Sequence, residues 1–196
     1  MNRLREAYKN KYRDELKKEL GLKSTMAVPN LERIVVNSGV GEAVDNKQAL
    51  EDVIEIMTLI TGQKPVVTSA KKAVSSFKIR EGNEIGVKVT LRGDRMWDFF
   101  DKLVNITLPR VKDFHGLSPK SFDGSGNYSI GIEDHVVFPE IDPNKVQKLR
   151  SLQITLVISG NSDDNSKAFL DKFGFPFKKD GNWSKKSTRE KVKKVV

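Results

Sequence analysis

The sequence predicts a single α+β domain: a mainly antiparallel sheet with helices on one face and an open second face. Ile85–Arg92 and Leu152–Ser159 alternate between mainly apolar and mainly polar side chains, as strands with one buried face do. Amphipathic helical segments separate the strands and supply cover for one sheet face. The length of 196 residues, with an apolar fraction of 37%, fits one domain with one core.

The N-terminal segment is predicted to be an amphipathic helix. From Asn2 to Leu20 an apolar side chain recurs every four residues, and Gly21 ends the pattern. The apolar positions are Leu4, Tyr8, Tyr12, Leu16 and Leu20. A strand is expected at Leu31–Glu42, where it runs into a glycine turn.

A second helix is expected after that turn. Asp45, with Gln48 three residues later, resembles a capping box, and Gly62 stops the helix. Its apolar face consists of Leu50, Val53, Ile54, Met57 and Ile60. The short strand Pro65–Ser69 follows, and a basic loop then leads into the alternating strand at Ile85–Arg92.

A third helix is predicted to begin at a cap formed by Asp94, to run to Leu108 and to end at Pro109. Its buried side is expected to consist of Trp97, Phe100, Leu103 and Val104. Residues 110–127 are rich in Gly, Ser and Lys and have the composition of a loop.

Short strands are predicted at 128–132 and 135–138, before the alternating strand at Leu152–Ser159. A last helix is expected to start near Asp163 and Asp164, because negative charge stabilises a helix N-terminus. Its apolar residues are Ala168, Leu170 and Phe173, and Gly174 closes it.

The composition excludes several classes of protein. There is no cysteine, hence no disulfide framework and no thiolate chemistry. The start MNRLREAYKNKY lacks the apolar region of a secretory signal, and no run of 18 apolar residues exists. We therefore expect a cytoplasmic protein without membrane contact.

No set of residues assembles a catalytic or metal site. His115 and His135 have no metal-ligating neighbours at a usable spacing. Gly39–Val44 lacks the third glycine of a dinucleotide fingerprint, and Asp123–Asp134 lacks the glycine and glutamate of a calcium loop. Neither an enzyme nor a cofactor or metal is expected.

The positive charge is concentrated in two windows. The net charge is +9; residues 64–95 contribute +5, residues 180–196 contribute +4, and the remaining segments are neutral. Concentrated positive charge attracts polyanions and predicts binding to nucleic acid. The cations that can meet phosphates in the first window are Lys71, Lys72, Lys78, Arg80, Lys88, Arg92 and Arg95.

Phe77 lies between cations in the stretch AKKAVSSFKIREGNEIG (70–86), which fits neither a helical nor a strand period. Two interpretations are open: a core anchor that pins the loop, or a ring that stacks on a base or ribose. In the second case, Val74 and Ile79 pin the loop instead.

Several long blocks resemble the bacterial large-subunit ribosomal protein that binds 5S rRNA, ribosomal protein five of the large subunit. They are VNSGVGEA, TGQKPVVTSAKKAVSSFKIREG, IGVKVTLRGDRMWDFFDKL, PRVKDFHGLSPKSFDGSGNYSIGI, FPEI and FGFPFKK. The resemblance is collinear over about residues 2–179. It implies a structural protein that attaches 5S rRNA to the large subunit, beside 23S rRNA and the other 5S-binding proteins.

The resemblance also implies sites. The open sheet face is expected to meet 5S rRNA through Asn37, Gln63, Thr90 and Arg92, and Lys88 shares the polar face of the strand that carries Thr90 and Arg92. The loop 70–84 is expected to reach P-site tRNA through Lys71, Lys72, Ser75, Ser76, Phe77, Lys78 and Arg80. A segment around 110–131, including Arg110, Lys112 and His115, is expected to meet small-subunit protein thirteen in an intersubunit bridge.

The chain continues past 179, where bacterial members usually end. Residues 180–196 hold six cations and Trp183, which suggests an extension that is disordered alone and orders on rRNA or a neighbouring protein. A merely solubilising tail is the alternative. For the whole protein, the alternative function is a free-standing RNA chaperone or regulator, and an RNA-directed enzyme comes third.

Overall fold

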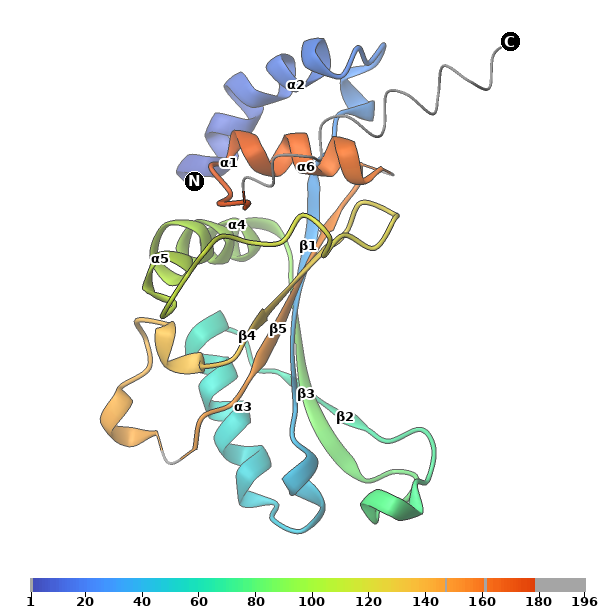
Figure 1. Cartoon of the computed structure of the whole chain (residues 1–196), viewed down its shortest axis with the longest axis vertical. Coiled ribbons are helices and arrows are strands. Elements are labelled where there is room, and N and C mark those ends of the chain that lie inside the picture. The colour runs from blue at the N-terminus through green and yellow to red at the C-terminus, as the bar shows by residue number, and fades with distance from the viewer. Residues whose placement is uncertain (1, 147, 161, 179–196) are drawn as a thin grey trace.

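The computed structural model describes residues 2–146, 148–160 and 162–178, and shows one five-stranded sheet (Figure 1). The strands are β1 (Leu31–Gly39), β2 (Val66–Ser69), β3 (Glu84–Leu91), β4 (Tyr128–Ile132) and β5 (Leu152–Ile158). Their order across the sheet is β2-β3-β1-β5-β4, and every neighbouring pair is antiparallel. The α+β prediction is confirmed.

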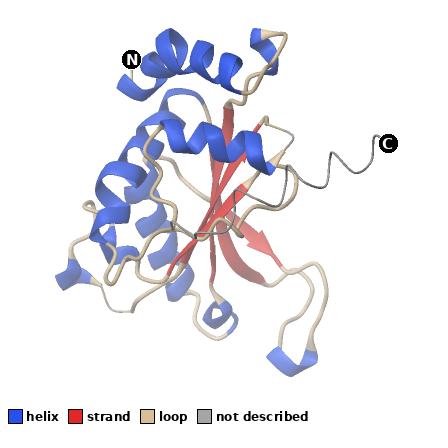
Figure 2. Ribbon diagram, turned by 45° about the horizontal axis from the view of Figure 1, so that its top comes forward, coloured by secondary structure: helices blue, strands red, loops and turns tan. Residues whose placement is uncertain are grey.

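Helices gather on one side of the sheet, as Figures 1 and 2 show. They are α1 (Arg3–Ala7), α2 (Arg13–Glu19), α3 (Gln48–Thr61), α4 (Gly93–Lys102), α5 (Leu108–Arg110) and α6 (Asp163–Lys172). A π turn at Tyr8–Tyr12 joins α1 to α2, and another at Leu103–Thr107 joins α4 to α5. The N-terminal helices and the β2–β3 hairpin loop lie at opposite ends of the molecule.

Two predicted helix caps are wrong. Lys47 is the residue before α3, and Asn46, not Asp45, accepts a hydrogen bond from the Gln48 backbone N–H at 3.0 Å. Asp94 lies within the first turn of α4 and makes no cap, because its carboxylate pairs with the Arg5 guanidinium. Both segments are helical as predicted, since the apolar face drives helix formation more strongly than the cap.

Two further boundaries differ from the prediction. The third helix continues past Pro109 to Arg110. The wider π turn ends at Thr107, two residues before the proline, which lacks the N–H of an α-helical turn. His135–Val137 forms a 3₁₀ helix rather than a strand. A short apolar run does not distinguish these two structures by its periodicity.

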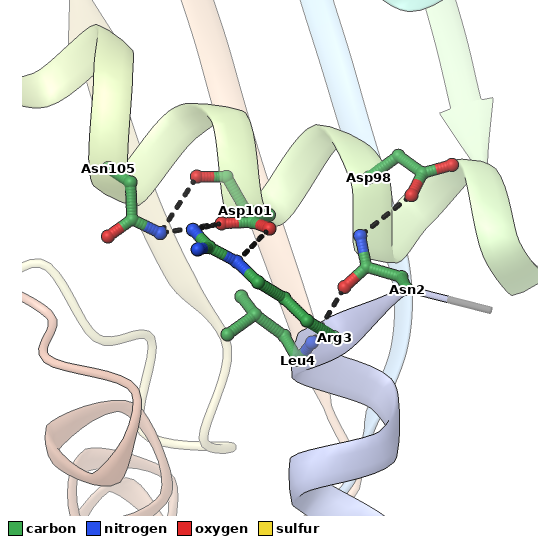
Figure 3. A network of polar contacts seen from close by, with 6 residues as sticks. All are labelled: Asn2, Arg3, Leu4, Asp98, Asp101 and Asn105. Carbon is green, nitrogen blue, oxygen red and sulfur yellow. Dashed lines mark hydrogen bonds and ion pairs between the residues drawn. The ribbon is translucent and has the colours of Figure 1, made fainter.

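An aromatic cluster joins the N-terminal helix to the rest of the core. The Tyr8 ring lies 5.9 Å from Trp97 and 5.7 Å from Phe169, and its hydroxyl donates to the Pro29 carbonyl at 2.8 Å. Polar contacts flank this packing (Figure 3). Arg3 binds the Asp101 carboxylate through two hydrogen bonds of 2.8 Å, and this bonding lowers the pKa of Asp101. The N-terminal segment is therefore part of the domain.

The buried His135 gives the fold a dependence on pH. Burial lowers the pKa of its imidazole, and Nδ1 accepts a hydrogen bond from the Arg150 N–H at 3.1 Å. The unfolded chain binds this proton near its ordinary pKa of about 6.5, and the folded chain only at lower pH. The free energy of unfolding should therefore fall as pH drops below about 6.5, by at most ~1.4 kcal/mol per pH unit.

Urea unfolding at several pH values between about 7.5 and 5.5 measures how the free energy of unfolding changes with pH. In this range the histidine takes up its proton before the carboxylates do. His135→Asn keeps a hydrogen-bond acceptor without a titrating ring and should flatten this slope. His115 is exposed, so His115→Asn serves as the control and should leave it unchanged. A slope that survives in His135→Asn would contradict this assignment.

Candidate nucleic-acid interface

The side chains on the uncovered face of the sheet are identified by the alternation of buried and more exposed residues along each strand. In β1, Ile34 and Val36 are fully buried, so Val35 and Asn37 place their side chains on the opposite face. The strand register carries this face across the sheet, because directly paired residues share a side.

One row of paired residues crosses all five strands. Asn37 pairs with Lys88 of β3 on one side and with Gln153 of β5 on the other. Lys88 in turn pairs with Val66 of β2, and Gln153 with Gly131 of β4. We call this set the Asn37 row: Val66, Lys88, Asn37, Gln153 and Gly131. A ligand that lies across the sheet would meet one cation, Lys88, and two side-chain amides, Asn37 and Gln153.

A parallel row, here the Thr90 row, lies next to it. Thr90 pairs with Val35, Val35 with Thr155, and Thr155 with Ser129. The hydroxyls of Ser129 and Thr155 are 3.1 Å apart and share a hydrogen bond. Neither row contains a carboxylate, so nothing within them opposes the charge of Lys88. The face therefore suits a ligand that carries negative charge and hydrogen-bonding groups.

The remaining predicted contacts lie at the end of the Thr90 row. The Gln63 amide nitrogen is 3.5 Å from the Thr90 carbonyl, which holds the half-buried Gln63 beside β3. Gly62 ends α3 in the left-handed conformation (φ +65°) and so turns the chain toward this position. Arg92 directly follows β3 and is exposed. The five predicted residues Asn37, Gln63, Lys88, Thr90 and Arg92 are thus brought together.

The sequence reasoning missed the contribution of β4 and β5 to this face. Gln153 and Thr155 alternate with buried leucines and isoleucines, so the signal was present in the same period-two pattern. What the pattern lacks is the register that aligns Gln153 with Asn37. A hollow of about 440 Å³ opens beside them, and both Asn37 and Gln153 line it.

The hairpin loop between β2 and β3 is held by backbone hydrogen bonds and extends away from the sheet (Figure 2). Ala70 N–H donates to Asn83 at 2.8 Å, and Val74 and Ile79 exchange hydrogen bonds of 2.9 and 3.1 Å. The predicted loop residues are all exposed: Lys71, Lys72, Ser75, Ser76, Phe77, Lys78 and Arg80.

Phe77 lies in a 3₁₀ turn at the tip of this loop, with 72% of its surface exposed. It is therefore not a core anchor in this structure. The Val74–Ile79 bridge pins the loop, as the second interpretation required. An exposed ring among cations is free to stack on a base.

The segment that follows α5 presents a separate surface. Arg110, Lys112 and His115 are exposed, and the segment is tied to the core behind them. The Tyr128 hydroxyl donates to the Ser118 carbonyl at 2.7 Å, and burial raises the pKa of that phenol to about 12. The phenol therefore remains a hydrogen-bond donor over the whole neutral range.

The described part of the chain contains neither a metal-ion site nor a membrane-spanning helix. No group of three or more histidine, aspartate or glutamate side chains there is arranged to hold a metal ion. Among the same residues, no helix combines the length and the apolarity needed to span a lipid bilayer.

Two family models match the chain. Residues 24–80 match the model described as Ribosomal protein L5, and residues 84–177 match the model that describes the C-terminus of the same ribosomal family. Together they cover about three quarters of the sequence. The two matched parts share one sheet, because β1 and β2 of the first pair with β3 of the second. The Asn37 row and the Thr90 row lie entirely within the matches.

Proposed function

Since the chain belongs to the ribosomal protein L5 family, and so is a structural constituent of the large ribosomal subunit, we propose that its open sheet face binds 5S rRNA and attaches it to the subunit. The observation that carries this proposal is the Asn37 row, in which Lys88, Asn37 and Gln153 lie side by side without a carboxylate. Phosphate contact positions the RNA, and the amides read it locally.

The other expected contacts form part of the same proposal. The exposed hairpin loop contacts P-site tRNA, and the segment around 110–131 contacts small-subunit protein thirteen in an intersubunit bridge. The loop connects β2 and β3, which are two strands of the sheet face, so RNA on the sheet and tRNA at the loop tip are held by adjoining parts of the chain. 23S rRNA and the other 5S-binding proteins are the remaining partners, in the cytoplasm.

We also propose that residues 1–179 form the binding domain and that 180–196 are an appended extension. The buried apolar residues of the described chain extend no further than Phe175, with Phe177 packed against them. The extension itself lies outside the described residues.

Fractionation of a cell lysate tests the proposed function. The protein should co-sediment with large ribosomal subunits, and raised salt should release both the protein and 5S rRNA from them, because salt weakens phosphate contacts. The alternative, a free-standing RNA chaperone, predicts a protein that stays with small soluble RNAs in all gradients. That second pattern would overturn the proposal.

A further inference from the structure

A groove of about 690 Å³ lies on the helical side of the molecule, between α3 and the segment 140–150. Its floor is partly apolar and includes Ile56, Leu59 and Ile141. Leu59 is 53% exposed, although it lies on a helix whose other leucine is buried. Leu59 lines the groove together with Ile56 and Ile141, and a contiguous apolar surface rimmed by polar residues marks an interaction site.

The rim of this groove is acidic, in a protein with a net charge of +9. The carboxylates are Glu42, Asp52, Glu55, Glu140 and Asp142. Cations already neutralise two of them, since Glu42 pairs with Lys148 and Arg150, and Glu140 pairs with Lys102 at 2.5 Å. Asp52 and Glu55 have no cationic partner among the described side chains. RNA is repelled here, and a basic segment with apolar side chains is attracted.

The chain itself carries such a segment. Residues 180–196 contain six Lys and Arg against two acidic residues, together with Trp183, Val192, Val195 and Val196. The family match ends at residue 177 and assigns no role to them. We propose that the groove between α3 and 140–150 binds the C-terminal segment 180–196 of its own chain when the protein is free of RNA.

The length of the segment permits this. Seventeen residues span up to about 55–60 Å when extended, whereas a compact domain with a radius of gyration of about 16 Å is roughly 40 Å across. Docking within one chain also proceeds at a high effective concentration, on the order of millimolar, so a weak contact suffices. The docked segment shields its own positive charge and leaves the sheet face, on the other side of the molecule, accessible to RNA.

Trp183 reports on this contact. The chain has two tryptophans, so Trp97→Phe in the full chain leaves Trp183 as the only one. Acrylamide quenching of its fluorescence should rise roughly twofold when Glu55→Lys removes the attraction, as expected when a half- to mostly-docked population is released. Glu6→Lys, the same charge change on an exposed glutamate of α1, is the matched control and should leave quenching low.

A second measurement does not depend on the Trp97 substitution. Zero-length cross-linking of the unmodified protein should join Asp52 or Glu55 to lysines of the segment, and raised salt should reduce the yield. Equal quenching in the Trp97→Phe protein and in its Glu55→Lys and Glu6→Lys variants, with no such cross-links, would overturn the proposal. So would protection of Trp183 that appears only with added rRNA, which would make RNA the partner, or only at high protein concentration, which would make it a second copy.

Discussion

Phe100→Ala is expected to lower the free energy of unfolding by about 3–5 kcal/mol, the cost of removing a fully buried phenylalanine from a packed core. Phe100 has no exposed surface and lies on the buried face of α4. The centroid of its ring lies 5.6 Å from that of Phe173, edge to face, and 6.3 Å from that of Phe175, on which it stacks. Removal of the ring would leave a cavity between α4 and the C-terminal aromatic residues that pack against it.

The chain offers a matched control in Phe77. The same substitution there removes a ring that is 72% exposed, so Phe77→Ala should change stability by no more than about 0.5 kcal/mol. Urea unfolding of both variants measures the difference directly. A loss of several kcal/mol in Phe77→Ala would show that the loop packs on the domain, contrary to the structure. A small loss in Phe100→Ala would mean that the core collapses around the vacancy.

Most elements of this fold follow from local periodicity. The alternation in β3 and β5 and the four-residue spacing in the N-terminal helix record which side chains are buried, and burial is what stabilises these elements. Features that depend on single polar groups were less predictable. Asp94 was expected to cap a helix, but a guanidinium 89 positions away competes for its carboxylate.

The candidate site shows the same division. Lys88 and Thr90 were identifiable because they lie on the polar side of one alternating strand. Their neighbours depend on strand register, which brings Asn37, Lys88 and Gln153 into one row from three distant parts of the chain. The net charge of a sequence segment likewise did not predict the acidic groove. The segments 1–63 and 96–179 are neutral in sequence, yet the fold gathers Asp52 and Glu55 of one beside Asp142 of the other.

Lys88→Glu is expected to weaken 5S rRNA binding by about 30- to 150-fold, because it removes a charged contact worth about 2–3 kcal/mol and adds repulsion to phosphate. The position is exposed, and its paired neighbours Asn37 and Val66 are uncharged, so stability should change by no more than about 0.5 kcal/mol. The salt dependence of binding should also become shallower by about 0.7–0.9 log units per log salt for the phosphate contact that is lost.

Lys71→Glu makes the same charge change on the exposed hairpin loop and separates a local contact from a general electrostatic effect. If the sheet face binds 5S rRNA and the loop serves tRNA, Lys71→Glu should cost the purified protein–5S pair less than about threefold, the scale of a distant, screened charge. The same variant should weaken tRNA contact in assembled ribosomes. Filter binding at fixed salt compares the two proteins: equal losses would mean that net charge alone drives binding, and an unaffected Lys88→Glu would place 5S rRNA off the sheet.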